Sequence, residues 1–546
     1  MSSAEPGAPA RATPKQWAGL AVLALPTMLL ALDLTVLYMA VPHLGADLGA
    51  SSTELLWIMD IYGFMVAGFL ITMGTLGDRI GRRRLLLIGA AAFGAASALA
   101  AFSTSTEMLI AARTLLGFAG AMLMPPTLAL LTVMFTDPRQ RSVAVAVWLM
   151  SFTVGGVLGP AVGGLLLEFF WWGSVFLLAL PVMAVLLLAG PFLLPEYRNA
   201  AAGRMDLVSV ALSLAAILPF VHGMKEIAAG GPGAVPFLSL AAGLAAGAVF
   251  VRRQRRLAEP LLDLRLFSGR TFTGALLALL LGQVVFYSFT YHFTQFMQLV
   301  QGLSPFAAGL WFIPLGVASV AGATAAPALA ARFPPAAVIG GGLAVCAAGF
   351  AAMALVGPAA GPALFTAGAV VAVLGAQPLL ALSTDMVVGS APPERTGTAS
   401  GMAETGAEFG AALGIAVFGS LSAAVYASRV GGLLPEGLSA EQAQSAQGGL
   451  AGLIAVAGEL PGSLADRVLA AGREAFTDGM NAVMASGALL MLGTAVLVLV
   501  LLRHLPPIGR EEGTAEPDRG GDDVPAADRG PAAGPGPGAA PARPIE

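Results

Sequence analysis

Three ionisable side chains, Asp33, Asp60 and Arg113, lie inside long apolar stretches of this 546-residue chain. Each stretch is long enough to form a helix that crosses a hydrocarbon core of about 30 Å. At 1.5 Å rise per residue, the three groups fall at a common depth, roughly 21 to 22 Å above the inner face. Because a charge in hydrocarbon costs at least about 2.5 to 3.5 kcal/mol, we expect one hydrated, paired cluster that binds and releases protons. The alternative is a structural ion pair, with one acid near the outer interface.

Two further acids, Glu404 and Glu408, are four residues apart and therefore face the same side of a helix. Gly406 and Gly410 lie about 200° around that helix, so the glycines can pack against a neighbour while the glutamates face a cavity. Two carboxylates this close resist simultaneous ionisation, so one can hold a proton until a cation arrives. We expect the pair near or below the middle of the membrane, where it would neutralise a positively charged substrate. The alternative is an entrance lining without a coupling role.

Four aromatic residues are candidates for contacts with a substrate. Aromatic faces attract planar cations, so a drug pocket can be lined by such rings. Packing or lipid contact is the alternative for each of them. The candidates are Trp57, Tyr62, Tyr287 and Tyr291.

Other kinds of site are not indicated by the sequence. No nucleophile and base constellation or metal-ligand spacing stands out, so we expect no catalytic residue, no enzyme activity, no metal and no cofactor. The lone cysteine, Cys346, cannot form an internal disulfide and makes a thiolate metal site improbable. The only lysines are Lys15 and Lys225, and neither follows a glycine as a phosphate-binding loop requires. Transport powered by this chain's own ATP hydrolysis is therefore disfavoured.

Apolar residues dominate the elements that must position these groups. The chain is 57% hydrophobic and 11% charged, whereas soluble domains carry about a quarter charged residues. We expect an all-α polytopic membrane protein with fourteen transmembrane helices. Their predicted spans are 18–41, 55–76, 84–103, 107–131, 142–166, 172–194, 206–224, 234–251, 271–299, 306–329, 335–356, 361–384, 396–426 and 480–502.

Basic residues predict the orientation, because cytoplasmic loops carry the Lys and Arg excess. With the N-terminus inside, most of the 28 Lys and Arg residues lie on the cytoplasmic side. An even number of spans then places both termini in the cytoplasm, in a multi-pass protein of the inner (plasma) membrane. The basic residues expected outside are Lys225, Arg429, Arg467 and Arg473.

Glycines at four-residue spacing reveal an internal repeat between the fifth and thirteenth spans. The fifth span has Gly155, Gly159 and Gly163, and the thirteenth has Gly406, Gly410 and Gly414. Two six-helix halves with an insertion between them follow from this pairing. The predicted regions are a cytoplasmic segment (1–14), an N-terminal bundle (15–195), a linker with two inserted helices (196–268), a C-terminal bundle (269–505) with an external loop (about 429–478), and a disordered cytoplasmic tail (506–546). The loop stretches AEQAQSAQ and LADRVLAAGREAF are predicted to form short amphipathic helices.

The segment GTLGDRIGRRR, residues 74–84, resembles the signature loop of major facilitator transporters, with every signature glycine, acid and base present. Glycines allow a tight turn and close helix approach, and an acid there can pair with an arginine or a helix N-terminus. We expect the loop to be a conformational latch between the two halves; the alternative is a basic loop that only sets topology. The residues assigned to the latch are Gly74, Gly77, Asp78, Arg79, Gly81, Arg82 and Arg83.

Two more motifs narrow this resemblance. The fifth-span stretch 155–164 resembles the helix motif of proton-driven exporters, and residues 32–42 resemble the first-helix motif of the fourteen-span drug:H⁺ antiporters. Small residues at every fourth position let two helices touch, while a proline kinks the helix. In the fourth span Leu116 stands where the family pattern has glutamine, so the resemblance does not determine the hydrogen bonding around Arg113. The exporter motif consists of Gly155, Gly159, Pro160, Gly163 and Gly164.

The resemblance is closest to multidrug exporters of quaternary ammonium compounds, and it implies a proton-coupled antiporter that exports lipophilic, cationic drugs. In this interpretation Asp33, Asp60 and Arg113 couple transport to protons, and the two glutamates neutralise the substrate. The partners are then protons, small-molecule drugs and membrane lipids, with no nucleic acid and no obligate protein partner. Two alternatives remain: an exporter of one neutral or anionic natural product or antibiotic, and a non-transporting membrane scaffold or receptor.

Overall fold

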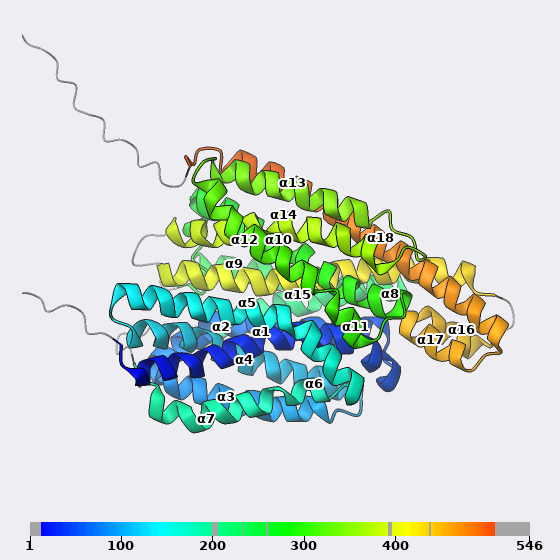
Figure 1. Ribbon diagram of the computed structural model, residues 1–546, viewed down its shortest axis with the longest axis horizontal. Helices are drawn as coiled ribbons and strands as arrows, with labels where there is room; N and C mark the ends of the chain where they lie inside the picture. Colours follow the sequence, from blue (N-terminus) through cyan, green and yellow to red (C-terminus); the bar gives the residue numbers. More distant parts are fainter. Residues whose placement is uncertain are drawn as a thin grey trace, which may run out of the picture. The chain divides into compact units, whose positions relative to one another are not determined.

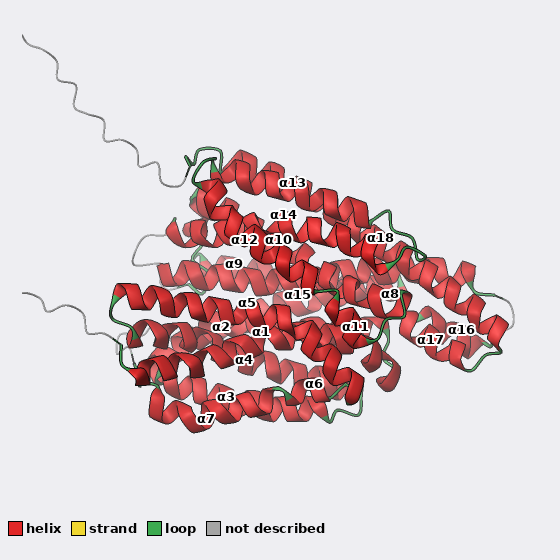
Figure 2. Ribbon diagram, in the orientation of Figure 1, coloured by secondary structure: helices red, strands yellow, loops and turns green. Residues whose placement is uncertain are grey.

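A computed structural model of the protein describes residues 12–198, 206–231, 233–257, 260–390, 396–435 and 438–507 (Figure 1). Most of the predicted N-terminal segment and nearly all of the predicted disordered tail lie outside the described residues. The described chain is helical, with no strand among its residues (Figure 2). Within it, fourteen helical segments are long and apolar enough to cross a membrane, which confirms the predicted number of spans.

Most spans are single helices, and two are broken into a short and a long piece. In the first half of the chain they are α1 (Pro14–Leu48), α2 (Ser52–Ile80), α3 (Arg82–Ala101), α4 (Thr106–Met134), α5 (Pro138–Phe169), α6 with α7 (Ser174–Leu177 and Ala179–Leu193), α8 (Leu207–Gly230) and α9 (Ala234–Gln254). In the second half they are α10 (Arg270–Gln295, extended by a π-helical turn at Phe296–Val300), α11 with α12 (Pro305–Leu310 and Ile313–Ala330), α13 (Pro335–Met353), α14 (Pro362–Gly389), α15 (Thr396–Leu433) and α18 (Gly462–Leu501).

Local sequence signals set several helix ends. Ser51 accepts a hydrogen bond from the Glu54 amide, and the Glu54 side chain accepts one back from the Ser51 amide, which makes a capping box at the start of α2. Asp137 caps α5 in front of a proline, the residue best suited to a first helical turn. Gly49 ends α1 with a φ of 61°, a left-handed conformation that favours glycine. These signals keep the connections between neighbouring spans short.

The glycine repeat serves the same packing purpose in both halves of the molecule. A side chain at Gly155 or Gly159 of α5 would overlap atoms of α1, and a side chain at Gly410 or Gly414 of α15 would overlap backbone atoms of α10. The fifth helix of each half therefore lies directly against the first helix of the same half. In Figure 1 the helices α1–α7, which we call the N-terminal half, lie beside α10–α15 and α18, the C-terminal half.

The two inserted helices, α8 and α9, form a hairpin that packs against only part of the bundle. Gly223 of α8 and Gly243 of α9 let their backbones touch. On its other side α8 contacts α2 of the N-terminal half and α15 of the C-terminal half. On α9, Leu238 and Leu244 are 68% and 64% exposed, as expected for side chains that face lipid.

The region between the last two spans differs in part from its prediction. The stretch AEQAQSAQ forms α16 (Ala440–Gln447), as expected, and α17 (Leu450–Gly458) follows it. The stretch LADRVLAAGREAF belongs to the first turns of the 40-residue helix α18 and is not a separate short helix. The amide and hydroxyl of Ser52 both donate to the Gly448 carbonyl, at 3.1 and 2.5 Å. The turn between α16 and α17 thus lies on the start of α2 in the N-terminal half.

Candidate functional site

Arg113 of α4 is buried at the centre of the N-terminal half, where it joins three helices. Its Nη1 donates to Asp33 Oδ2 of α1 at 3.0 Å, and its Nε donates to the Ile58 carbonyl of α2 at 3.2 Å. The guanidinium carbon lies 4.5 Å from the centroid of the Tyr62 ring. The arginine side chain is 1% exposed and the aspartate side chain 6%. The predicted pairing of Arg113 with an acid at the same depth is therefore present, and Tyr62 takes part through a cation–π contact.

Asp60 does not join this pair, which corrects the prediction of a single three-residue cluster. Its Oδ2 lies 2.7 Å from Nζ of Lys225 on α8, and both side chains are fully buried. Equal depth does not bring groups together when they face different sides of a helix. Asp60 is two residues from Ile58 and from Tyr62, which places it about 200° around α2 from the face that meets Arg113.

Lys225 was predicted to lie outside the membrane, and this prediction was wrong. Helix α8 continues to Gly230 and does not end near residue 224, so Lys225 is inside the span. Its Nζ is also 3.9 Å from the centroid of the Trp57 ring. The signal that could have revealed it is the scarcity of lysine: the chain has only Lys15 and Lys225, and the second directly follows an apolar run.

Glu408 lines a small cavity at the boundary between the two halves. Arg113 and Tyr38 border this cavity from the N-terminal half, and Glu408 and Tyr287 border it from the C-terminal half. Glu408 is 8% exposed, and no described cation forms an ion pair with it. The full lining consists of Leu34, Tyr38, Met59, Gly63, Arg113, Tyr287, Glu408, Ala411, Ala412 and Ile415. The structure thus brings together three predicted residues, Arg113, Tyr287 and Glu408, and adds Tyr38, for which the sequence offered no distinguishing pattern.

Glu404 and Tyr291 lie away from that lining. Glu404 is half-buried one helical turn before Glu408 on α15. The Tyr291 ring is 6.5 Å from the Tyr38 ring, and its hydroxyl accepts a hydrogen bond from Gln295 at 3.1 Å. Tyr291 borders a second cavity, which Ser52, Tyr426 and Gly448 also line, next to the segment that follows α15. Of the four predicted aromatic residues, only Tyr287 borders the same cavity as Glu408.

Contacts between the halves are present on the side where α16 and α17 lie. Gln298 donates through Nε2 to the Met39 carbonyl at 3.1 Å, which joins the π-helical turn to α1. A side chain at Gly164 of α5 would overlap the Pro305 carbonyl of α11, and a side chain at Gly309 of α11 would overlap the Pro160 carbonyl of α5. Gly155, Gly159 and Gly163 of the same motif pack on α1. The exporter motif therefore packs α5 against α1 of its own half and against α11 of the other half.

The signature loop contacts the end of α7 and the segment that follows it. Asp78 pairs with Arg82 at 2.7 Å, one helical turn away. Arg83 donates to the carbonyls of Pro191 and Leu194 at 3.1 and 2.9 Å, and its Nε lies 3.6 Å from Glu196.

The glycines of this loop allow close approach. Gly81 has a φ of 110°, and a side chain there would overlap Glu196. Gly74 and Gly77 face Pro125 and Pro126 of α4, and Arg79 is exposed. The described contacts of the loop are thus with its own half, and a latch between the halves stays a prediction.

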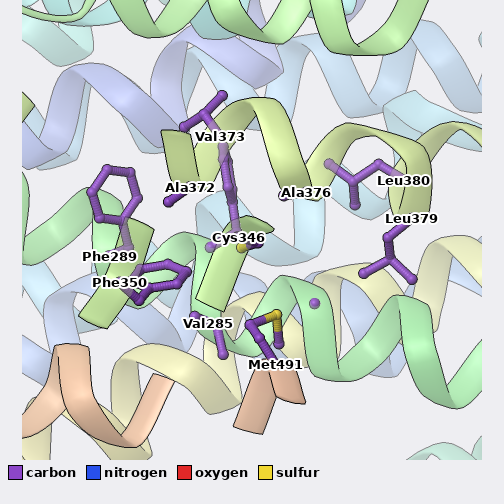
Figure 3. Close-up of a pocket in the computed structure, with 12 residues that line it drawn as sticks. Val285, Phe289, Cys346, Phe350, Ala372, Val373, Ala376, Leu379, Leu380 and Met491 are labelled. Carbon is purple, nitrogen blue, oxygen red and sulfur yellow. The ribbon is translucent and has the colours of Figure 1, made fainter. Parts of the chain in front are cut away.

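A purely apolar pocket lies elsewhere, inside the C-terminal half (Figure 3). Four helices, α10, α13, α14 and α18, contribute its side chains, and the buried Cys346 lies among them. None of the predicted acids borders it, so we place the functional site at the Glu408 cavity. Its residues are Gly282, Val285, Phe286, Phe289, Cys346, Phe350, Ala372, Val373, Ala376, Leu379, Leu380 and Met491. Over the described parts of the chain, no group of three or more His, Cys, Asp or Glu residues is placed to hold a metal ion.

Comparisons with known proteins show which family this chain is similar to. A family model described as Major Facilitator Superfamily matches residues 23–415. The multidrug efflux pump LfrA of Mycolicibacterium smegmatis is 43% identical, over 92% of this chain and 100% of its own length. The methyl viologen resistance protein SmvA of Salmonella typhimurium is 35% identical, over 88% of this chain and 97% of its own. The tetracenomycin C resistance and export protein of Streptomyces glaucescens is 31% identical, over 88% of this chain and 91% of its own length.

Solved structures give the same fold at low sequence identity. A bacterial homologue of the lysosomal transporter Spinster, in an inward-facing and unoccupied conformation, superposes with a TM-score of 0.61. It is 18% identical and the match covers 90% of this chain and 98% of that one.

Proposed function

This chain belongs to the Major Facilitator Superfamily, and we propose that it is a proton-coupled antiporter that exports lipophilic cations across the cell membrane. The observation that carries the proposal is the buried carboxyl group of Glu408, which borders one cavity together with Arg113 of the opposite half. The relatives named multidrug efflux pump and methyl viologen resistance protein support the class of substrate. The basic residues favour an orientation with both termini in the cytoplasm.

Glu408 has the properties of an exchange site for a proton and a cation. An ionised carboxylate in a low-dielectric cavity needs a positive partner, and no described cation forms an ion pair with Glu408. Either a proton or a positively charged drug can satisfy that need, and binding of one removes the attraction for the other. Glu404, one turn away, offers a second carboxylate for a divalent cation.

The Asp33 and Arg113 pair gives the N-terminal half its own response to protons. While Asp33 is ionised it holds the guanidinium, which also lies on Tyr62 and on the Ile58 carbonyl. Protonation of Asp33 would weaken that contact and change the field at the cavity where Arg113 faces Glu408. Because one charged group belongs to each half, a change in protonation can bias the position of the halves, and alternating access is largely their rigid-body rocking.

A second candidate function is export of one neutral or anionic natural product. The observation that favours it is the 31% identical relative named as a tetracenomycin C resistance and export protein. In that case the acids would serve protons alone, and the charge of the substrate would not affect the role of Glu408.

Transport by purified protein in sealed liposomes tests both functions. An imposed pH gradient is expected to drive ethidium across the membrane, and collapse of the gradient with a protonophore is expected to stop it. If a neutral compound moves and no cation does, the second function is correct. If a pH gradient drives neither class of compound, proton-coupled export is wrong.

A further inference from the structure

The ammonium group of Lys225 occupies a buried site that has two walls. The Asp60 carboxylate lies 2.7 Å from Nζ, and the Trp57 ring centroid lies 3.9 Å from it. Both charged side chains are fully buried. Only Oδ2 of Asp60 lies within ion-pair distance of Nζ, and in the described chain neither Asp60 oxygen nor Nζ has a hydrogen-bond partner of good geometry. The site therefore holds an ammonium ion with part of its carboxylate unused.

A carboxylate beside an aromatic face is also the arrangement that recognises organic ammonium ions. The ring attracts the cation through its quadrupole, and the carboxylate supplies the counter-charge. Trp57 also packs against a buried apolar cluster, which consists of Phe64 of α2, Val221 of α8, and Ala412 and Ala416 of α15. These walls match a cation that carries apolar groups, for which the lysine side chain is a poor mimic.

Helix α8 cannot keep all its present contacts throughout a transport cycle. It packs on Gly68 of α2 through Leu214, and on α15 through Val221 in the cluster with Ala416. Helix α2 belongs to the N-terminal half and α15 to the C-terminal half. When one half rocks against the other, α8 must move relative to at least one of them. Movement of α8 relative to α2 would change the distance between Lys225 and Asp60, because these residues lie on those two helices.

We propose that Asp60 and Trp57 form a binding site for an organic ammonium ion, and that Lys225 fills this site as a tethered competitor in the present conformation. The proposal depends on the proposed function only for the chemical class of the ion that binds. It gives the inserted hairpin a direct part in substrate binding: α8 withdraws its own ammonium group when the site is to receive a drug.

Binding to the purified full-length protein at fixed pH tests this proposal, with ethidium as the probe. Lys225→Met removes the competing charge and keeps a long apolar side chain, whereas the control Lys225→Arg keeps the charge. A competitor that leaves about a tenth of the sites free lowers the apparent affinity tenfold, so Lys225→Met is expected to tighten binding by about that factor. The Arg variant is expected to show no gain. Equal affinities of the Met and Arg variants would overturn the proposal.

The gain in ethidium affinity must also depend on Asp60 and Trp57. In the Lys225→Met protein, Asp60→Asn is expected to cancel the gain, and Trp57→Leu to reduce it severalfold. A gain that survives Asp60→Asn would mean that ethidium binds elsewhere. The series is repeated in a Glu408→Gln protein, where the gain is expected to persist because Lys225 is paired with Asp60 and not with Glu408. This step separates the proposal from the proposed function, whose failure would appear as absent transport with the Lys225 effect intact.

Chemical restoration of the charge provides a second measurement. In a Cys346→Ser protein, which has no other cysteine, Lys225→Cys can be labelled with a methanethiosulfonate that carries an aminoethyl group once movement of α8 exposes residue 225 to the reagent. The thiolate attacks the reagent's sulfenyl sulfur, a mixed disulfide forms and methanesulfinate leaves. The restored ammonium is expected to weaken ethidium binding, whereas the neutral hydroxyethyl reagent is not. If Lys225→Met and Lys225→Cys fail to fold while Asp60→Asn with Lys225→Met folds, the pair is purely structural and the proposal is wrong.

Discussion

Nη1 of Arg113 on α4 lies 3.0 Å from Oδ2 of Asp33 on α1, although the two residues are 80 positions apart in the chain. The pair is almost completely buried, so neither charge can turn to water if its partner is lost. Removing one partner of a buried ion pair costs about 3 to 5 kcal/mol, because the remaining charge stays uncompensated. The pair can therefore combine a structural role with a role in coupling, and mutations must separate the two.

Asp33→Asn is expected to abolish efflux driven by a pH gradient, because the amide keeps the shape of the side chain but cannot titrate. It should also lower the melting temperature of the purified protein, since Arg113 is left without its counter-charge. The double variant Asp33→Asn with Arg113→Met is expected to regain stability without regaining transport. Glu441→Gln, at an exposed acid of α16, is the matched control. Gradient-driven efflux in the stabilised double variant would remove Asp33 from coupling.

Glu408→Gln is expected to reduce the efflux of cationic dyes by about tenfold, the effect of losing roughly 1.4 kcal/mol of charge compensation. Neutral substrates should lose less, because they need no counter-charge. Glu404→Gln is expected to act in the same direction but more weakly, since Glu404 does not line the cavity. Efflux of monovalent, divalent and neutral compounds at matched expression and fixed pH gradient measures the difference. Equal losses for all three classes would assign the glutamates to coupling or structure.

The exporter motif offers a test with a control in the same helix. A side chain at Gly159 would overlap Thr35 and the Leu32 carbonyl, whereas a side chain at Gly156 would meet nothing within 4 Å. Gly159→Ala is expected to lower the yield of folded protein and the transport rate, because α5 must move away from α1. Gly156→Ala is expected to preserve both, since alanine favours a helix by about 0.5 to 1 kcal/mol over glycine. Matching yields of the two variants would show that α5 and α1 tolerate a wider separation.

In the signature loop, Asp78→Ala is expected to reduce transport while membrane insertion and thermal stability stay close to wild type. Asp78 is paired only with Arg82 among the described residues, in a partly exposed position. Arg83→Gln should instead lower thermal stability, since Arg83 holds the carbonyls of Pro191 and Leu194. Transport and melting temperature, measured on the same preparations, compare the two. Unchanged efflux in Asp78→Ala at normal expression would exclude the latch.

Asp206, the capping residue of α8, makes the stability of the inserted hairpin depend on pH. Burial alone would raise the pKa of its carboxyl group, but hydrogen bonds from Ser209 and Arg253 outweigh burial and lower the pKa below its usual value. A group with a lowered folded-state pKa contributes stability above its unfolded pKa, about 3.9, and loses that contribution as the pH falls through the folded pKa. Thermal stability should fall in acid, and the fall should be smaller in Asp206→Asn. Identical acid profiles would contradict the prediction.

The sequence was sufficient for the fold because hydropathy, charge bias and glycine spacing each depend on residues close together in the chain. It also predicted the pairing of Arg113 with an acid, since depth follows from helical rise. It could not predict the partner of Asp60. Which way a side chain points around a helix axis is set by packing against neighbours, and the neighbour here is an inserted helix whose end the apolar pattern placed too early. The approach of Tyr287 and Glu408 to Arg113 likewise depends on how the two halves meet.

The position of Trp57 beneath the Lys225 ammonium has an optical consequence. The emission of an indole ring shifts with the electric field across it, and a charge 3.9 Å from the ring centroid is a strong source of field. Only six tryptophans contribute to the fluorescence of the chain, so the Trp57 signal can be isolated as the difference between wild-type and Trp57→Phe spectra. The protein thus carries an intrinsic fluorophore at the contact of α2 with α8. The emission wavelength of Trp57 can report the departure of Lys225 during turnover without any added label.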